Sequence, residues 1–294
     1  MVELEGRDTE AQGTEARDLD LRTTGELVAL MNELDAAVPA AVGAASDALT
    51  DAIDAIVDRL RAGGRLVYVG AGSSGLQAAA DAAECEATFS TPPGRVVALH
   101  ADEPAAEDDA EAGARAVEAL GVGAADAVVG VSASGRTPYV VAALEAAAAA
   151  GAFTACVVST PGSRLAEVAE REIAVAVGPE LIAGSTRLKS GTAQKLVLNT
   201  ISTVSMIRLG KVFDNLMVDV SASNEKLRLR ARRIVEGVAG VGSDEAEAAL
   251  AAAGGSAKVA ILCLLERLDA AEARRRLEAA GGDLRTALGG REPA

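Results

Sequence analysis

Two short segments of the sequence combine glycines with hydroxyl side chains, as anion-binding turns do. They are Gly70-Ala71-Gly72-Ser73-Ser74-Gly75 and Ser132-Ala133-Ser134-Gly135-Arg136-Thr137-Pro138. Glycines permit a tight turn, and its free backbone N–H groups and hydroxyls bind a phosphate without added positive charge. The candidate phosphate-binding residues are Gly72, Ser73, Ser74, Gly75, Ser132, Ser134, Gly135, Arg136 and Thr137.

Neither segment is specific when it is taken alone. A Gly-rich turn also occurs where a strand simply passes into a helix, and the first segment lacks the third glycine of the dinucleotide-binding fingerprint. Pro138 suits the first turn of a helix, so both segments are expected to lead from a strand into a helix. Together they would bring two helix dipoles to one anion, and we therefore predict a single phosphate site built from both.

The acid–base chemistry available to this chain rests mainly on carboxylates. His100 is the single histidine, which leaves little for a Ser-His-Asp triad or a histidine metal site, and it could equally be a packing residue at a strand end. The three cysteines, Cys85, Cys156 and Cys263, are widely spaced and suggest neither a disulfide framework nor a metal site. We expect no metal, no other cofactor and a reducing compartment.

Composition limits the partners of the protein. Its 294 residues carry a formal net charge of −15, which repels nucleic acid and anionic lipid. The first twenty residues lack an apolar signal region, and the longest apolar run, 196–209, is interrupted by polar side chains. We therefore expect a cytoplasmic protein that acts on a small molecule, with no nucleic-acid or membrane partner.

The middle of the chain reads as a parallel α/β fold. Short β-branched runs alternate with helical stretches, which is typical of βαβ units in a sheet buried on both faces. In such sheets ligands bind beyond the carboxyl ends of the strands. The predicted strands are 65–70, 95–100, 127–132, 154–160 and 172–177.

The flanking segments read as helices. Residues 1–24 are a polar segment, and two helices are predicted between residues 25 and 62. A long helix is predicted over 190–209 and a basic one over 223–238. We expect a binding and catalytic domain over 25–240 and a small helical module over 241–294.

The two turns resemble the phosphosugar-binding signature of the sugar isomerase (SIS) domain, whose fold is a five-stranded parallel sheet flanked by helices. Three further motifs resemble one branch of these proteins, the N-acetylmuramic acid 6-phosphate etherases. The resemblance runs from Thr14 into the helical tail. The motifs are GSTRLKSGTAQKLVLN at 184–199, GKVFDNLMVDV at 210–220 and SNEKLR at 223–228.

This resemblance implies a lyase that removes the D-lactyl ether from N-acetylmuramic acid 6-phosphate, giving N-acetylglucosamine 6-phosphate and D-lactate in amino sugar catabolism. Elimination at C3 needs a base for the C2 proton and an acid for the departing oxygen, and two carboxylates can share that work. Water then adds to the unsaturated sugar. The resemblance also implies a homodimer with a shared cleft, and it adds Ser185 and Lys189 to the substrate-binding residues.

By resemblance, Glu84 is the acid and Glu107 the second carboxylate. The chain is shorter than the family near Glu107, so Glu103 or Glu111 remains an alternative for that role. An unbroken helix from Ser74 to Glu84 would be about 15 Å long, more than a hexose phosphate spans. Either this helix ends early and folds back, or Glu84 serves the site of a neighbouring subunit.

Two departures from the family pattern leave other functions open. Leu76 stands where the family usually has arginine, and Glu86-Ala87 replaces a pair of prolines. Losing a cation beside a phosphate should weaken binding or shift its role to Arg136, Arg187 or Lys189. The alternatives are a sugar-phosphate-sensing regulator without catalysis and an aldose–ketose phosphosugar isomerase.

Overall fold

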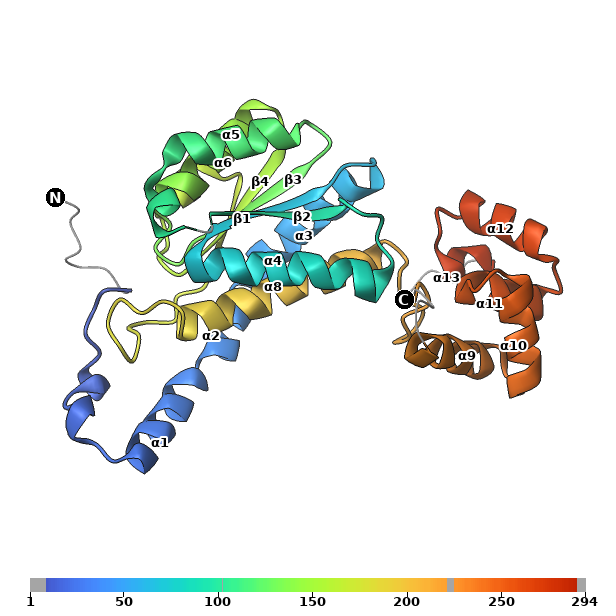
Figure 1. Ribbon diagram of the computed structural model, residues 1–294, viewed down its shortest axis with the longest axis horizontal. Coiled ribbons are helices and arrows are strands. Elements are labelled where there is room, and N and C mark those ends of the chain that lie inside the picture. Colours follow the sequence, from blue (N-terminus) through green and yellow to red (C-terminus); the bar gives the residue numbers. More distant parts are fainter. Residues whose placement is uncertain (1–8, 102, 221–224, 290–294) are drawn as a thin grey trace. The chain divides into compact units, whose positions relative to one another are not determined.

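The computed structural model describes residues 9–101, 103–220 and 225–289 (Figure 1). Residues 1–8 of the predicted polar segment, and positions 223 and 224 of the third motif, lie outside these ranges. The chain divides into two compact units. One comprises the residues up to Ala83 together with Gly94–Ser202, and the other comprises Glu84–Pro93 together with the chain from Thr203 onward.

The first unit is built on a five-stranded parallel sheet, which confirms the predicted fold class. Its strand order is β2-β1-β3-β4-β5, and each predicted strand is found to within a few residues. The runs form strands because Val, Ile and Ala side chains bury both faces of the sheet, most completely in β1, β3 and β4. The strands are β1 (Leu66–Ala71), β2 (Val96–Ala101), β3 (Ala127–Val131), β4 (Phe153–Val158) and β5 (Arg171–Ala174).

Helices cover both faces of this sheet. On one face lie α5 (Ala110–Leu120) and α6 (Pro138–Ala149), where Val140 and Leu144 pack against Val67 and Val128 of the strands (Figure 1). On the other face lie α3 (Ser46–Arg61), α4 (Gly72–Phe89) and α8 (Lys189–Arg208). Two further short helices complete the connections, η3 (Pro104–Asp108) and α7 (Arg164–Val168).

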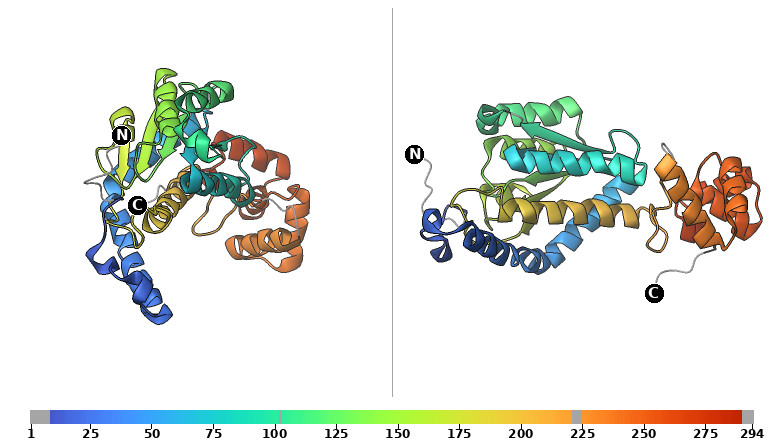
Figure 2. Two further views of the ribbon diagram at one scale, coloured as in Figure 1. Left: turned by 60° about the vertical axis from the view of Figure 1, so that its left-hand side comes forward. Right: turned by 60° about the horizontal axis from the view of Figure 1, so that its bottom comes forward.

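The helices α4 and α8 run side by side in Figures 1 and 2. The side-chain amide of Gln77 donates a 3.2 Å hydrogen bond to the carbonyl oxygen of Gly191, which ties the first turns of the two helices together. The predicted helix over 190–209 is α8, displaced by one residue at each end.

The N-terminal segment forms three helices where the sequence predicts two. After the short turns η1 (Thr14–Ala16) and η2 (Leu19–Leu21) come α1 (Thr24–Asp35), α2 (Val38–Ala44) and α3. Pro39 lies in the first turn of α2 and has no N–H to bond the carbonyl group of Asp35, so the helix breaks before it. The backbone leaves the α conformation again at Ala45, which separates α2 from α3.

The second unit contains a cluster of five helices with its own core. Val235, Ile261 and Leu262 are fully buried in this core, together with Val218 and Val220 from the segment before the helices. The predicted basic helix is α9, which begins at Glu225. The helices are α9 (Glu225–Ala239), α10 (Ser243–Ala252), α11 (Ala257–Glu266), α12 (Ala270–Ala279) and α13 (Leu284–Ala287).

The strand order places the two Gly-rich turns next to each other. β1 lies between β2 and β3, so the chain leaves β1 toward one edge of the sheet and the later strands build toward the other. Such a reversal opens a crevice at the carboxyl ends of the two central strands, where ligands bind. The first turn follows β1 and the second follows β3.

Candidate active site

The first turn is packed too closely for side chains at two of its glycines. A Cβ atom on Gly70 would lie 2.7 Å from the backbone nitrogen of Gly75, and one on Gly75 would lie 1.9 Å from Cδ2 of His100. Gly72 starts α4 with a φ of +50°, a conformation that favours glycine. Ser73 is exposed and Ser74 half-buried, so the hydroxyls of this turn lie at the amino end of α4 within reach of solvent.

The second turn is held by its own hydroxyl groups. Ser132 Oγ and Thr137 Oγ1 lie 3.0 Å apart, and the backbone N–H of Gly135 donates a 3.1 Å hydrogen bond to Ser132 Oγ. Both hydroxyl residues are buried, whereas Ser134 and Arg136 between them are half-buried. Thr137 is the residue immediately before α6, and Pro138 occupies the first position of that helix as predicted.

Glu107 lies between the two turns. Thr137 Oγ1 donates a 3.3 Å hydrogen bond to Glu107 Oε1, and Glu107 Oε2 would be 3.9 Å from a Cβ atom on Gly72. The carboxylate comes from η3, the short helix after β2. The structure therefore brings one carboxylate, the amino end of α4 and the amino end of α6 to one place.

The two alternative carboxylates lie differently. Glu103 is exposed before η3. Glu111 is exposed in the first turn of α5, where its Oε2 pairs with Arg115 at 3.2 Å. Of these three acids, Glu107 is the one with a described hydrogen bond to a residue of the two turns.

Glu84 stands well away from the first turn along α4. This helix is unbroken from Gly72 to Phe89, so the possibility that it ends early and folds back is wrong. Twelve helical steps of 1.5 Å separate Gly72 from Glu84, a rise of about 18 Å. Glu84 is exposed on the second compact unit, whereas the two turns belong to the first.

Lys189 and Ser185 are placed by contacts with their own segment. Lys189 is buried, and its Nζ donates a 2.7 Å hydrogen bond to the carbonyl oxygen of Val177. Ser185 is half-buried, and its N–H donates to the carbonyl oxygen of Ile182. No described contact joins either side chain to the two turns.

The amino end of α8 is occupied by a carboxylate of the protein. Glu180 is 1% exposed, and its Oε2 and Oε1 each accept a 2.9 Å hydrogen bond, from the N–H groups of Lys189 and Ser190 respectively. A carboxylate in this position satisfies the free amides of a helix terminus and complements its dipole. Glu180 was not among the residues predicted from the sequence, because an acid ten residues before the predicted helix over 190–209 is only a weak signal.

A buried polar contact also fixes α4 on the sheet. Asp81 is 2% exposed, and it accepts hydrogen bonds from Tyr68 Oη at 3.0 Å and Ser202 Oγ at 3.1 Å. These residues come from α4, β1 and α8. Asp81 was missed because an isolated acid on a helix is usually a surface residue.

An ion pair lies at the opposite ends of the strands. Arg65, just before β1, donates to both carboxylate oxygens of Asp126, just before β3, at 3.1 and 2.7 Å. Burial alone would raise the pKa of the Asp126 carboxyl group, but hydrogen bonds from Arg65 and from the N–H of Gly123 outweigh it and lower the pKa. This pair is structural, because the site lies at the carboxyl ends.

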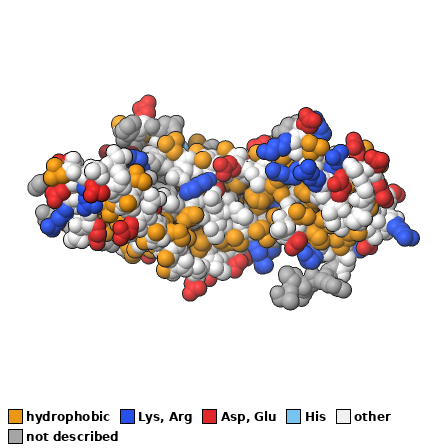
Figure 3. All heavy atoms as spheres, turned by 90° about the horizontal axis from the view of Figure 1, so that it is seen from below, with side chains coloured by type: hydrophobic (Ala, Val, Ile, Leu, Met, Phe, Trp, Pro, Cys, Tyr) orange, Lys and Arg blue, Asp and Glu red, His pale blue; other side chains and the backbone are white. Residues whose placement is uncertain are grey.

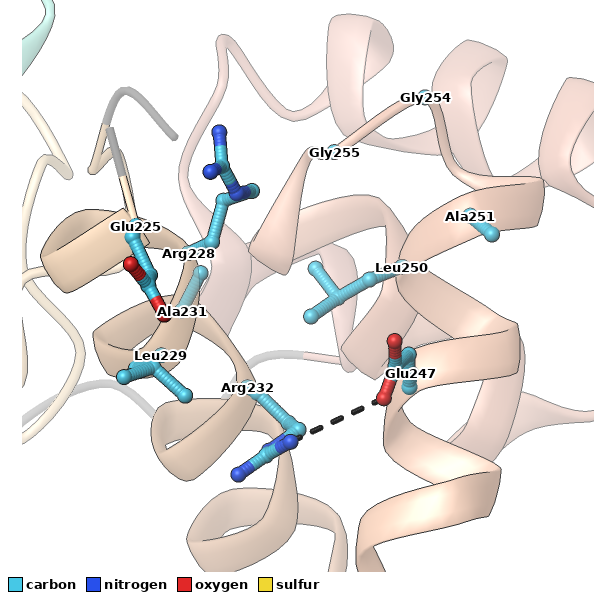
Figure 4. A pocket seen from close by; sticks show the side chains of 10 residues that line it. All are labelled: Glu225, Arg228, Leu229, Ala231, Arg232, Glu247, Leu250, Ala251, Gly254 and Gly255. Carbon is cyan, nitrogen blue, oxygen red and sulfur yellow. Dashed lines mark ion pairs between the residues drawn. The ribbon is translucent and has the colours of Figure 1, made fainter. Parts of the chain in front are cut away.

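The three cavities measured among the described residues lie apart from the two turns. The one in Figure 4 has a volume of about 460 Å³ and lies between α9 and α10, with Arg232 paired to Glu247 across it. At the candidate site, Ser73 is exposed to solvent.

Cysteine and metal chemistry have little support in the described residues. None of Cys85, Cys156 and Cys263 forms a disulfide bond, and burial raises the pKa of Cys156 to about 12. No group of three or more His, Cys, Asp or Glu side chains that could hold a metal ion occurs in the described ranges.

Several apolar side chains of the first unit face solvent. Leu76 on α4 is 63% exposed, and Val28 and Met31 on α1 are 56% and 39% exposed. Figure 3 shows hydrophobic side chains spread over the surface seen from below, the side on which α1 and α2 lie in Figure 1. Among described residues, Thr24–Ala44 is long and apolar enough to cross a membrane by length and composition alone, with 11% of that stretch buried.

Comparisons with known proteins agree with this architecture. Residues 31–159 match the family model described as SIS domain. The chain is 55% identical to an N-acetylmuramic acid 6-phosphate etherase of Rubrobacter xylanophilus, covering 97% of both chains. It is 51% identical to one of Streptomyces avermitilis, covering 98% of this chain and 95% of the relative.

A solved structure supports the fold independently. A phosphoheptose isomerase from Francisella tularensis superposes with a TM-score of 0.53 at 20% identity, covering 63% of this chain and all of that one. At this identity the likeness shows the fold alone.

Proposed function

This chain belongs to the N-acetylmuramic acid 6-phosphate etherase family, and from that membership we propose how its residues divide the work of the reaction. The relatives match over nearly their whole length, so the chain carries the etherase function, a carbon–oxygen lyase activity in amino sugar catabolism. This function replaces the regulator and isomerase alternatives that the sequence left open.

The phosphate of the substrate binds at the two turns. The amino ends of α4 and α6 supply backbone N–H groups and dipoles, and Ser73, Ser74 and Ser134 supply hydroxyls. A site made of N–H groups, helix dipoles and hydroxyls can bind a dianion with few cationic side chains, which suits a protein with a net charge of −15. Of the predicted ligands, Lys189 has its ammonium group engaged by the carbonyl oxygen of Val177, and Ser185 stays a predicted ligand.

Glu107 is the base that takes the C2 proton. Its carboxylate accepts a hydrogen bond from Thr137, which keeps its oxygens pointed at the cradle where the sugar is held. This single contact carries the assignment, because it joins an acid–base group to the second predicted turn. The role of general acid at the departing C3 oxygen then falls to Glu84.

Glu84 reaches a bound sugar through a second copy of the chain. The unbroken α4 holds it too far from the turns of its own subunit for a hexose phosphate to span. The exposed Val28 and Met31 of α1 give the first unit apolar surface that a partner subunit would cover. The proposal is therefore a homodimer in which each site combines the Glu107 of one subunit with Glu84 of the partner subunit.

A second subunit explains the apolar helices α1 and α2 better than a bilayer does. Glu26, Glu33 and Asp35 lie on α1, and each acid near a bilayer centre costs about 2.5–3.5 kcal/mol. Pro39 also breaks the stretch into two helices. With a phosphorylated substrate and three cysteines outside any disulfide bond, this supports a cytoplasmic enzyme.

Product analysis in heavy-oxygen water tests the reaction. Elimination followed by hydration places the heavy oxygen at C3 of N-acetylglucosamine 6-phosphate and leaves D-lactate unlabelled. In heavy water, deuterium should also enter at C2, because the C2 proton is removed and replaced. Cleavage without label at C3 of the sugar would overturn elimination followed by hydration.

Mixed subunits test the shared site. Glu84→Gln and Glu107→Gln variants are each expected to be inactive as pure preparations. In an equal mixture, half of the dimers carry one variant of each kind and one intact site, so about a quarter of the wild-type activity returns. A mixture that stays inactive while subunits exchange, followed by mass spectrometry, would place both carboxylates in one subunit.

A further inference from the structure

The residue after α4 is attached to the segment that precedes the C-terminal helices. Ser90 follows Phe89, the last residue of α4, and has a φ of +48°, unusual for a residue other than glycine. Its Oγ donates a hydrogen bond to the backbone carbonyl oxygen of Asp219. The carboxyl end of α4 is therefore tied to a residue more than a hundred positions away.

Asp219 is itself held by two ammonium groups. Its Oδ2 lies 2.8 Å from Nζ of Lys211 and 2.8 Å from Nζ of Lys258. The Lys258 side chain is 4% exposed, and its Nζ also donates a 2.7 Å hydrogen bond to the carbonyl oxygen of Gly282. Lys258 thereby links α11, the segment of Asp219 and the turn between α12 and α13.

Burying the charged groups of this network costs desolvation free energy, so we look for its role in the position of the residues that it joins. Burial lowers the pKa of Lys258, although Asp219 opposes that shift. Buried ion pairs commonly add little net stability over an apolar replacement. What this one does provide is a rigid position for Asp219, and through it for Ser90.

The compact units show which part of α4 this network holds. Glu84 and the rest of α4 group with the C-terminal helices, whereas α4 up to Ala83 groups with the sheet. Cys85 and Phe89, on the same stretch of α4, are buried. The end of α4 that carries Glu84 is thus fastened on the side of the C-terminal helices.

We propose that Asp219 and Lys258 are positioning residues, which fix the end of α4 through Ser90 and thereby set the orientation of the Glu84 carboxylate. The inference rests on the catalytic role of Glu84 in the proposed function. It gives the C-terminal helices a part in the reaction, because they hold a catalytic side chain that none of them contains.

The mildest test removes the CH2OH side chain of Ser90, and with it the hydrogen bond to Asp219. A Ser90→Gly variant keeps a residue that accepts a positive φ, so it is expected to fold. We expect kcat to fall by about tenfold to a hundredfold with KM within twofold, because small misplacements of a catalytic group cost that much while substrate binding is unaffected. Asp219→Asn and Lys258→Met should show the same division between kcat and KM.

A double variant separates positioning from general loosening. If Ser90 and Asp219 act through one link, Ser90→Gly/Asp219→Asn should be no slower than the slower single variant. Glu266→Gln is the matched control, since Glu266 pairs with Arg276 at 2.8 Å in the same helical cluster and no described contact joins it to Ser90. Its kcat should stay within twofold of wild type.

The outcomes are distinct. A folded Ser90→Gly or Lys258→Met variant with wild-type kcat overturns the inference, as does an equal loss in Glu266→Gln. If Asp219→Asn does not fold, the Ser90→Gly result still decides. Glu84→Gln is measured alongside. If it is active, the catalytic role assigned to Glu84 is wrong and this inference is wrong with it. If it is inactive, the Ser90→Gly result decides the inference by itself.

Discussion

The hydroxyl of Thr137 donates a 3.3 Å hydrogen bond to the carboxylate of Glu107, joining the turn after β3 to the short helix after β2. Thr137 also lies 3.0 Å from Ser132 Oγ. Its hydroxyl therefore connects the predicted phosphate cradle to the predicted base. A chain of this kind holds a carboxylate at a fixed angle to the substrate it acts on.

Replacing Glu107 should show whether it, and not Glu103 or Glu111, is the catalytic base. Glu107→Gln keeps the size of the side chain but cannot accept a proton, so kcat for lactate release should fall by about 10²–10⁴-fold. Glu103→Gln and Glu111→Gln are matched controls, since both acids are exposed and neither has a described contact with the two turns. A large loss in either control, with Glu107→Gln active, would move the base to that residue.

Leu76→Arg should tighten substrate binding. Leu76 is 63% exposed in the first turns of α4, immediately after the phosphate turn, where a cation would face the phosphate. We expect KM to fall by about 1.4-fold to fivefold with kcat little changed, because an exposed charge pair contributes about 0.2–1 kcal/mol.

Leu76→Gln controls for the loss of the apolar side chain. Equal KM values in the Arg and Gln variants would show that the charge has no effect. Raising the salt concentration should reduce the gain of the Arg variant alone.

Gly75→Ala should destabilise the protein and disorder the phosphate cradle. The added Cβ would lie 1.9 Å from His100 Cδ2 and 2.9 Å from the carbonyl oxygen of Gly70, and such overpacking costs about 1–3 kcal/mol or more. Gly25→Ala is the control, because Gly25 lies in α1 with nothing within 4 Å of the new atom. There we expect an unchanged or slightly higher melting temperature.

The Arg65–Asp126 pair should make stability sensitive to acid. The folded-state pKa of Asp126 lies below its ordinary value of 3.8, so its contribution is fully present above that value and is lost as the pH falls through the lowered one. The free energy of unfolding should therefore fall between about pH 5 and pH 2, and less steeply in Asp126→Asn than in wild type.

Urea unfolding at several pH values measures this slope. Other carboxylates contribute to the wild-type slope, which is why the comparison with Asp126→Asn is needed. Identical slopes in the two proteins would mean that the pair does not shift the titration of Asp126.

Much of the fold followed from the sequence because it depends on local pattern. The runs around Val67, Val128 and Ala155 are continuous and apolar, and Gly-rich turns bound the first two, which predicts buried parallel strands. The position of the two turns followed from the same pattern, since parallel strands end at one edge of the sheet.

What the sequence could not give depends on contacts between distant residues. The break between α1 and α2 was not predicted, because the apolar pattern continues across it. It arises from the effect of Pro39 on the helix backbone. The direction of the Lys189 side chain, toward Val177, depends on how a loop folds beneath α8. The hydrogen bond from Thr137, which favours Glu107 over Glu103 and Glu111 in the proposed function, likewise joins residues 30 positions apart.

The carboxylate of Glu180 at the start of α8 affects where on the protein an anion can bind. The helices α4, α6 and α8 each begin at or next to a predicted binding residue, but the amino end of α8 already binds the carboxylate of Glu180. Free phosphate or a sugar phosphate that approached α8 would meet negative charge and engaged amides. Under the proposed function, the phosphate therefore binds at the amino ends of α4 and α6 and not at that of α8.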